Sequence, residues 1–319
     1  MIDAHVHVWD PARLDYPWLA DAPVLQRAFL PADIDRGHPD EGESDRDDRS
    51  AVRATARMVF VQAGCRSDQA LDEVRWVLGL ADVWPELAAI VADADLRSGT
   101  ALERHLDALA AISDRGPSLS DQRSKGRRVG IPGVRHLLQD EPDELLHDRA
   151  SRTALLDGLR MLAHRGLTFD LCVRHPQLGS VVAMLEEVPG LRVVLDHVGK
   201  PPVDAGIDTR DGRAWADAID RMARLPSAHV KLSGLAAEAS DTEVLDANAG
   251  AFLAHAITAF GPDRAMLGSD WPVSALTGAT GTFAGWRERV RRAAHSAGVD
   301  VDGVASIEAG TASRFYALA

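Results

Sequence analysis

The sequence is short of lysine and of cysteine, and each shortage narrows the class of protein. Only three of its 35 basic residues are lysines (Lys125, Lys200 and Lys231), and 48 acidic residues give a formal net charge of −13. We therefore expect neither a nucleic acid nor an anionic membrane as a partner. The two cysteines, Cys65 and Cys172, lie far apart in the sequence. They predict no disulfide framework and a reducing compartment, the cytoplasm.

Long apolar runs are also missing. No stretch approaches the length of a membrane span, and no secretory signal is expected because an alternating strand-like segment already begins at residue 2. The hydrophobic content of 46% over 319 residues is still enough for one large core. These totals predict a soluble cytoplasmic protein, and they leave open whether it forms a homo-oligomer.

Apolar strand-like segments alternate with amphipathic helical segments along most of the chain. The expected strands are 2–8, 58–63, 87–96, 129–136, 167–173, 191–197, 228–233 and 264–270. The expected helices are 67–84, 101–112, 151–164, 176–187, 213–224, 243–260, 282–295 and 304–318. The segment 11–50, with an acidic run at 40–48, and the polar segment 117–128 are expected to be loops.

Eight repeated βα units predict an α/β fold, a (β/α)₈ TIM barrel that spans residues 1–319 as a single domain. A doubly wound open sheet is the structural alternative. It is disfavoured because no Gly-x-Gly-x-x-Gly sequence follows any expected strand.

The first expected strand carries two histidines two residues apart. Strict alternation predicts that Asp3, His5 and His7 share one face of the strand, with the apolar residues of segment 2–8 on the other. At the end of a strand, two imidazoles on one side can share a metal ion or hold one substrate atom. The pattern His-x-His is short, so the other strand ends decide its meaning.

Polar residues gather where the other strands end, which is where barrel active sites lie. These residues are Gln62, Arg135-His136, Arg174-His175, Asp196-His197, Lys231, Ser233 and Ser269-Asp270. Five of the twelve histidines fall at predicted strand ends. This convergence predicts a catalytic site.

His5, His7, His197 and Asp270 supply imidazole and carboxylate groups suited to one divalent ion, with zinc the best match. Such an ion lowers the pKa of a bound water and polarises a carbonyl. Without an ion, the imidazoles could donate hydrogen bonds to a carbonyl oxygen while Asp270 takes a proton from water. The sequence leaves both possibilities open.

Five further residues are expected to contact the substrate: Gln62, Arg135, His136, Lys231 and Trp271. Arginine can hold a carboxylate or polyol oxygens in a bidentate manner. For His136, a structural role as a hydrogen-bonded buried histidine is an equal alternative.

Three residues near the end of the fifth strand are assigned structural roles. We expect Arg174 to form a salt bridge at the barrel mouth, and Cys172 to be a small core residue. Strand parity places His175 on the same face as Phe169 and Leu171, so we expect a hydrogen-bonded histidine in the core or just behind the site.

Several longer motifs narrow the assignment. They are Asp3-Ala-His-Val-His-Val-Trp-Asp10, Gly133-Val-Arg-His-Leu-Leu-Gln-Asp-Glu-Pro142, Asp196-His-Val-Gly-Lys-Pro201, Val230-Lys-Leu-Ser-Gly-Leu235 and Gly268-Ser-Asp-Trp-Pro-Val273. In this order along nearly the whole chain, they resemble the amidohydrolase superfamily, in the branch once labelled amidohydrolase 2. Within that branch they are most similar to sugar-acid lactonases such as L-fuconolactonase and L-rhamnonolactonase.

The resemblance implies a distorted (β/α)₈ barrel with functional positions at His5, His7, His197 and Asp270. It implies that Asp270 is the general base that activates water for attack on the lactone carbonyl. The fourth strand ends in Arg135-His136 and shows no clear position for a carboxylated lysine. That departure argues against a two-metal centre, and members of the branch work with one metal or none.

The leading hypothesis is therefore a hydrolase that opens a small-molecule sugar-acid lactone of the aldono type. A metal-dependent decarboxylase of the same superfamily is the second hypothesis, and it requires a tightly bound ion. A non-catalytic sugar-acid binding protein is the third, and it has no need of a water-activating carboxylate.

Overall fold

The computed structural model describes residues 1–34, 57–115, 128–142, 144–276 and 282–318. Eight parallel strands form one sheet in sequence order. They are β1 (Ile2–Val6), β2 (Arg57–Val61), β3 (Leu87–Asp93), β4 (Gly130–Leu137), β5 (Thr168–Cys172), β6 (Val193–Leu195), β7 (Ala228–Leu232) and β8 (Ala265–Leu267). The sheet curls so that its first and last strands are in contact, and Val6 forms a parallel bridge with Trp271 just beyond β8.

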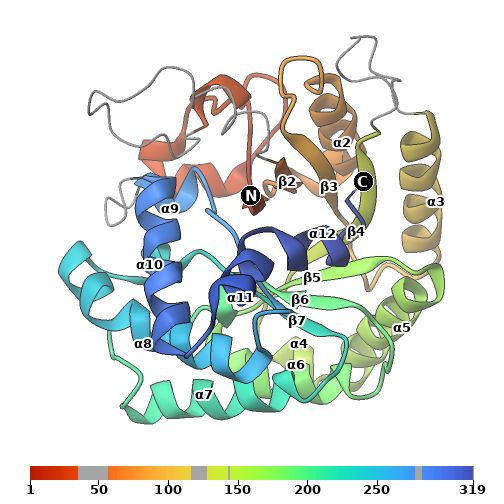
Figure 1. The fold of residues 1–319 in the computed structure, drawn as a ribbon. Coiled ribbons are helices and arrows are strands. Elements are labelled where there is room, and N and C mark those ends of the chain that lie inside the picture. The colour runs from red at the N-terminus through yellow and green to blue at the C-terminus, as the bar shows by residue number, and fades with distance from the viewer. Residues whose placement is uncertain (35–56, 116–127, 143, 277–281, 319) are drawn as a thin grey trace.

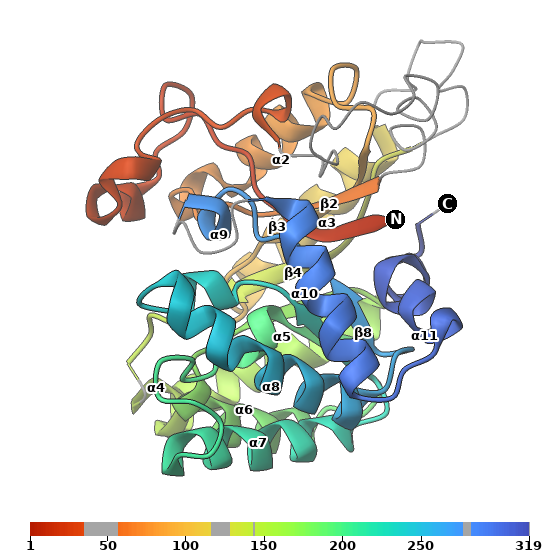
Figure 2. The same ribbon diagram turned by 60° about the vertical axis from the view of Figure 1, so that its left-hand side comes forward.

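Helices surround the strands on the outside, as the two views show (Figures 1 and 2). The longer ones are α2 (Ala70–Gly79), α3 (Thr100–Arg115), α5 (Arg149–Arg165), α6 (Leu178–Leu185), α7 (Arg210–Ala223), α8 (Thr242–Phe260) and α10 (Phe283–Ser296). The short helices are α4 (Glu144–His147), α9 (Val273–Leu276), α11 (Val301–Ala305) and α12 (Thr311–Phe315). The predicted α/β TIM barrel is confirmed.

Backbone hydrogen bonds just beyond β8 close the barrel. The Asp270 N–H donates to the His5 carbonyl at 2.8 Å, and the His7 N–H donates to the Trp271 carbonyl at 2.8 Å. The two strands predicted at 191–197 and 264–270 are shorter in the structure, because the chain leaves the sheet before His197 and Asp270. The closure is therefore irregular where those two side chains emerge.

The barrel interior begins with an apolar layer at the N-terminal ends of the strands. Its members are Ile2, Ala4, Val59, Val61, Ala89, Val91, Val194 and Met266. Phe315 and Tyr316, from α12 and the residue after it, pack against this layer. The C-terminal helices thereby cover the N-terminal end of the barrel (Figure 1). Catalytic residues in such a fold are expected at the opposite end.

The predicted alternation of the first strand is wrong in one respect. Ile2 and Ala4 face the barrel interior, whereas Val6 packs in the outer core, so the apolar residues do not share a face. The pairing of β1 with β2 shifts register between Asp3 and Val6. There the Asp3 carboxylate accepts the backbone N–H of His5 at 3.2 Å. This irregularity turns His5 inward although Ala4 also points inward.

The region after β1 is more ordered than a plain loop. Three 3₁₀ turns, Pro17–Asp21, Pro23–Leu25 and Pro31–Asp33, follow one another, each begun by a proline. The acidic run 40–48 and most of the predicted loop 117–128 lie outside the described residues. Among the described helices, none is long and apolar enough to cross a membrane.

Glu73, on α2, is a fully buried acid that accepts the backbone N–H of Ala63 at 3.1 Å. Burial raises the pKa of the Glu73 carboxyl to about 8. The folded protein therefore holds a proton there that the unfolded chain releases near pH 4.5. Because the folded state binds the extra proton, this group lowers stability as the pH rises from about 4.5 to 8.

We expect Glu73→Gln to remove that pH dependence, since the amide oxygen can still accept from Ala63. The variant should gain melting temperature over the wild type as the pH rises, by a few degrees, with the gain levelling off above about pH 8. Thermal unfolding of both proteins from about pH 5 to about pH 9 measures the difference. A difference in melting temperature that stays constant with pH would contradict the raised pKa of Glu73.

Candidate active site

A cavity of about 810 Å³ opens at the C-terminal end of the barrel. Its floor includes His7, His197 and Asp270, and its sides come from loops that follow β1, β2, β4, β5, β6 and β7. The lining residues that matter below are Trp9, Trp18, Arg66, Arg135, Gln139, Cys172, Arg174 and Lys200. The sequence thus predicted the end of the barrel at which the cavity lies.

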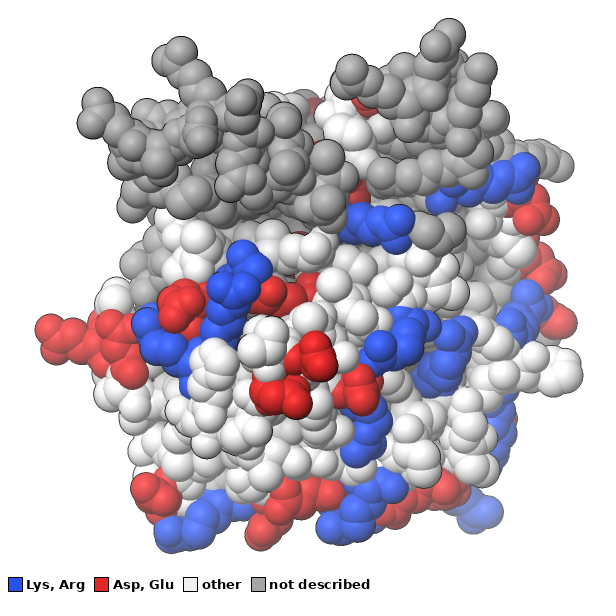
Figure 3. All heavy atoms as spheres, in the orientation of Figure 1, with Lys and Arg blue, Asp and Glu red and all other residues white. Residues whose placement is uncertain are grey.

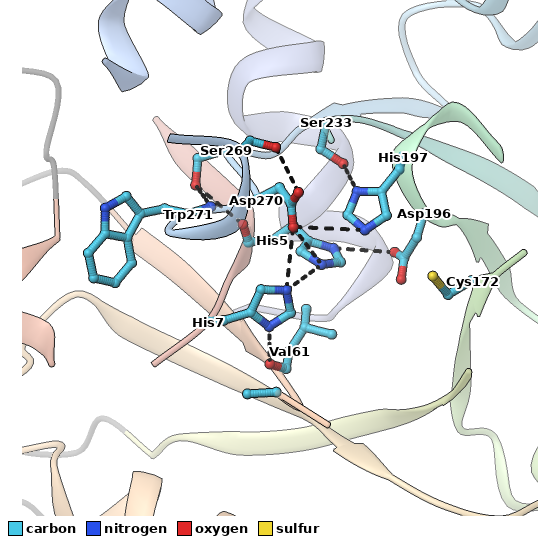
Figure 4. Close-up of polar contacts among 12 residues, drawn as sticks. His5, His7, Val61, Cys172, Asp196, His197, Ser233, Ser269, Asp270 and Trp271 are labelled. Carbon is cyan, nitrogen blue, oxygen red and sulfur yellow. Dashed lines mark hydrogen bonds and ion pairs between the residues drawn. The ribbon is translucent and has the colours of Figure 1, made fainter. Parts of the chain in front are cut away.

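Four side chains converge at the floor of this cavity (Figure 4). The Nε2 atoms of His5 and His7 are 3.1 Å apart. Asp270 Oδ1 lies 3.5 Å from His7 Nε2, 3.8 Å from His5 Nε2 and 3.9 Å from His197 Nε2. All four residues are at most 5% exposed. Residues 5, 7, 197 and 270 of the sequence therefore meet at one point.

The backbone is strained where two of these side chains emerge. His197 and Asp270 have φ angles of 53° and 58°, in the left-handed region that non-glycine residues rarely adopt. A Cβ atom on Gly234 would lie 2.3 Å from His197 Nδ1, so a glycine is needed there to make room for the ring. Such strain is typical of functional sites, where the surrounding packing enforces a required side-chain direction.

A partner on the far side of each group fixes its orientation. His7 Nδ1 lies 2.8 Å from the Val61 carbonyl oxygen, so Nδ1 carries the proton and Nε2 carries the lone pair. His197 Nδ1 lies 3.1 Å from Ser233 Oγ. The Ser274 hydroxyl donates to Asp270 Oδ2 at 2.7 Å, leaving Oδ1 to face the three rings.

Burial lowers the pKa of all three histidines, that of His197 to about 4. At neutral pH these imidazoles are therefore uncharged and can offer a lone pair. Burial alone would raise the pKa of the Asp270 carboxyl, but the adjacent rings of His197, His7 and His5 lower it below its ordinary value. The floor of the cavity thus combines a carboxylate with neutral imidazoles.

Three of these groups, His5, His7 and Asp270, lie at distances that suit a single divalent ion. Ligand atoms about 2.0–2.1 Å from a tetrahedral zinc ion lie roughly 3.3–3.4 Å from one another, close to the 3.1–3.8 Å observed among the three. His197 approaches this set through Asp270, at 3.9 Å. His5, His7 and Asp270 form one set of three possible ligands among the described residues. His5, Asp196 and His197 form another.

The second set of three already has a cation beside it. Lys231 Nζ lies 3.0 Å from both His5 Nδ1 and Asp196 Oδ1. A second divalent ion there would meet the ammonium group, whose charge repels it. The described residues therefore favour one ion over two, in line with the missing carboxylated lysine.

Cationic side chains form part of the cavity wall. Arg135 is buried, and its Nη1 lies 3.5 Å from His5 Nε2. Lys200 pairs with Glu238 at 3.1 Å, and Arg174 pairs with Asp140 at 3.3 Å. The salt bridge predicted for Arg174 is present, although the residue also lines the cavity. This wall is suited to hydroxyl or carboxylate oxygens of a ligand.

Four residues expected to contact the substrate do not line the cavity: Gln62, His136, Lys231 and Trp271. His136 points to the outside of the barrel, where Nδ1 lies 3.0 Å from the Leu96 backbone N and Nε2 lies 3.0 Å from Glu141 Oε1. Its structural alternative is therefore the one that the geometry supports. Figure 4 shows Trp271 pointing away from the four converging side chains.

The other two are displaced for different reasons. The Gln62 side chain folds back so that its Oε1 accepts the Gly64 N–H at 2.6 Å. Lys231 lies below the cavity floor, fully buried. Of the five expected residues, only Arg135 lines the cavity.

Sequence reasoning missed several residues of the cavity. Cys172 is buried, as expected of a core residue, but its thiol faces the cavity and lies 3.2 Å from Gln139 Oε1. Strand parity gave the signal, because Cys172 shares the inward face of β5 with Asp170. His175 is half-buried after β5, and its Nδ1 lies 3.1 Å from the carbonyl of Lys200, so it is a hydrogen-bonded histidine behind the cavity wall and not a core residue.

The described part of the outer face drawn in Figure 3 differs from the cavity wall. Acidic and basic side chains are interspersed there, without a broad area of one sign.

Comparison with known proteins identifies the family of this chain. The profile of the amidohydrolase family matches residues 2–318. The L-fucono-1,5-lactonase of Burkholderia multivorans is 32% identical over 328 residues, covering 99% of this chain and 96% of its own. The L-fucono-1,5-lactonase of Burkholderia ambifaria is also 32% identical, over 285 residues, covering 89% of this chain and 84% of its own.

A solved structure is similar over the same extent. The crystal structure of an amidohydrolase from Burkholderia multivorans with bound zinc has a TM-score of 0.75 and 30% identity, and covers 100% of this chain and 99% of that one. The resemblance predicted from the motifs is therefore confirmed. With a profile match from residue 2 to residue 318 and relatives that align from end to end, this chain belongs to the amidohydrolase family.

Proposed function

We propose that this protein is a lactonase that hydrolyses a sugar-acid lactone of the aldono type. The observation that carries the proposal is the convergence of Asp270 Oδ1 with three imidazole Nε2 atoms at the floor of an 810 Å³ cavity. Two relatives aligned over most of their length are L-fucono-1,5-lactonases, which supports the same reaction class here.

The donor set favours a site with a divalent ion over a metal-free one. His7 uses its only proton on the Val61 carbonyl, so its neutral ring cannot also donate to a carbonyl oxygen in the cavity. His5, His7, His197 and Asp270 would hold the ion, which when bound polarises the lactone carbonyl and acidifies water.

The residues of the chain divide the remaining work. Asp270 Oδ1 accepts a proton from the attacking water, whose oxygen forms a bond to the lactone carbonyl carbon. The ring carbon–oxygen bond then breaks, and Asp270 returns the proton to the leaving alkoxide. Lactone and water thus give one open-chain hydroxy acid, with no other reactant.

Substrate binding falls to the cavity wall. Arg135 lies beside the floor and is placed to hold the ring or carbonyl oxygens, while Lys200 and Arg174 reach hydroxyl groups farther out. Trp18, whose indole N–H is held by the Ala63 carbonyl at 2.8 Å, offers an apolar surface across the cavity. Such a mixture of polar and aromatic groups suits a polyhydroxylated ring.

Asp270→Asn tests the proposed base. An amide keeps the shape of the side chain but cannot take a proton, so we expect kcat to fall about 10²–10⁴-fold with little change in melting temperature. Turnover of an aldono-lactone, followed with a pH indicator, measures the effect. Retention of most of the rate would overturn the assignment of Asp270.

Arg135 and its neighbour His136 form a matched pair, because one faces the cavity and the other faces outward. We expect Arg135→Gln to lower kcat/KM by roughly 10–100-fold, since one charged hydrogen bond contributes about 1.5–3 kcal/mol. His136→Gln should keep kcat/KM within about threefold and lower the melting temperature instead. If the two substitutions had equal effects on kcat/KM, the placement of Arg135 at the substrate would be wrong.

Removal and return of the metal tests the proposed ion. We expect the chelated protein to lose most activity against a panel of five- and six-membered aldono-lactones and to regain it with about one equivalent of zinc. Full activity without metal would contradict the proposed ion and would also exclude a metal-dependent decarboxylase.

The same panel separates the remaining alternatives by their products. A decarboxylase would release CO₂ from a carboxylic acid and leave the lactones unopened. A lactone that binds without ring opening would indicate a non-catalytic binding protein. Either result would refute the lactonase proposal.

A further inference from the structure

A buried group of charged side chains lies directly below the cavity floor. Lys231 on β7 donates to Asp170 on β5 and lies 3.0 Å from Asp196 after β6. The Tyr316 hydroxyl, from the end of the chain, donates to the same Asp170 oxygen at 2.8 Å. Lys231 and both carboxylates are fully buried, and Tyr316 is 2% exposed. None of these four residues lines the cavity, so they do not bind substrate.

The group meets the three imidazoles at Nδ1 of His5, and it meets the cavity wall at Arg135, whose Nη1 lies 3.6 Å from Asp196 Oδ2. Lys231 Nζ, which can only donate, lies 3.0 Å from that atom. Asp196 Oδ1, which as a carboxylate can only accept, lies 3.3 Å from it. His7 and His197 each have one polar partner at Nδ1, at the Val61 carbonyl and the Ser233 hydroxyl. His5 alone among the three has a donor and an acceptor of full charge at the same nitrogen.

These two neighbours favour opposite tautomers of the ring. With a proton on Nε2, His5 accepts from Lys231 at Nδ1 and donates from Nε2 to the lone pair of His7 Nε2, 3.1 Å away. Since the His7 proton is on Nδ1, facing the Val61 carbonyl, this chain of hydrogen bonds is complete without an ion. With a proton on Nδ1, His5 instead donates to Asp196, and its Nε2 presents a lone pair that can bind an ion or accept from Arg135 Nη1, 3.5 Å away.

We propose that Lys231 and Asp196 are positioning residues that hold His5 in place in either tautomer. Lys231 supports the Nε2–H form of the metal-free site, and Asp196 supports the Nδ1–H form when Nε2 binds an ion. The ring is neutral in both forms, so one proton leaves Nε2 and one arrives at Nδ1, with no net change. Asp170, which accepts from Lys231 Nζ, fixes the ammonium group so that it cannot follow the ring. The second half of this inference rests on the proposed ion, and the first half does not.

Long-range ¹H–¹⁵N NMR of the histidine rings tests the inference, because it distinguishes the two tautomers. The His5 signals are assigned by their loss in His5→Gln. We expect Nε2–H in the chelated wild-type protein and Nδ1–H after zinc is added. An Nδ1–H ring in the chelated protein would overturn the role given to Lys231.

Two variants should favour opposite tautomers of the His5 ring. Lys231→Met removes the donor, so the chelated variant should show the Nδ1–H form that the wild type shows only with zinc. Asp196→Asn removes the charged acceptor, so it should keep Nε2–H and bind zinc about 10–100-fold more weakly in calorimetry of the metal-free protein. Tyr316→Phe, which keeps the aromatic ring and its packing, is the matched control and should leave the tautomer unchanged.

The outcomes separate this inference from the proposed function. If wild-type protein binds no zinc, the proposed ion and the role of Asp196 fail, whereas Nε2–H in the wild type and Nδ1–H in Lys231→Met still support Lys231. If Lys231→Met is too unstable for NMR, the zinc affinity of Asp196→Asn still decides the role of Asp196. Unchanged zinc affinity in Asp196→Asn would overturn that role. Loss of a merely structural contact would leave the zinc affinity unchanged, whereas loss of a positioning residue should weaken it.

Discussion

The hydrogen bonds that join β1 to the turn after β8 are the constraint on which the site depends. They hold His5 and His7 beside Asp270, although more than 260 residues separate these positions in the sequence. Neither partner segment could be moved by one residue without turning its side chains away. The register shift in β1 and the left-handed backbone of Asp270 are local costs of that junction.

The charged side chains buried beneath the cavity floor balance one another. Asp170, Asp196 and Lys231 lie between the apolar layer and the cavity floor, where an unpaired charge would be strongly destabilising. Arg135 Nη1, 3.6 Å from Asp196 Oδ2, adds a second cation. Two carboxylates and two cations thus neutralise one another. The floor above them can then keep neutral imidazoles next to an ionised Asp270.

The sequence predicted the barrel well, because alternating βα units leave few other ways to bury their apolar faces. It also predicted which residues meet at the floor, since strand ends converge in a barrel. It did not predict that Gln62 and His136 would turn to backbone and carboxylate partners, or that Lys231 would lie below the floor. Such details depend on depth along the barrel axis and on bulges, which alternation alone does not encode.

Coverage of the N-terminal end of the barrel by α12 has a consequence for the folding of the protein. Tyr316 joins the buried group under His5, although more than 300 residues separate the two positions in the sequence. Contacts between such distant segments form slowly, because the intervening chain must be brought together first. We therefore expect the last short helix to dock on the barrel late in folding.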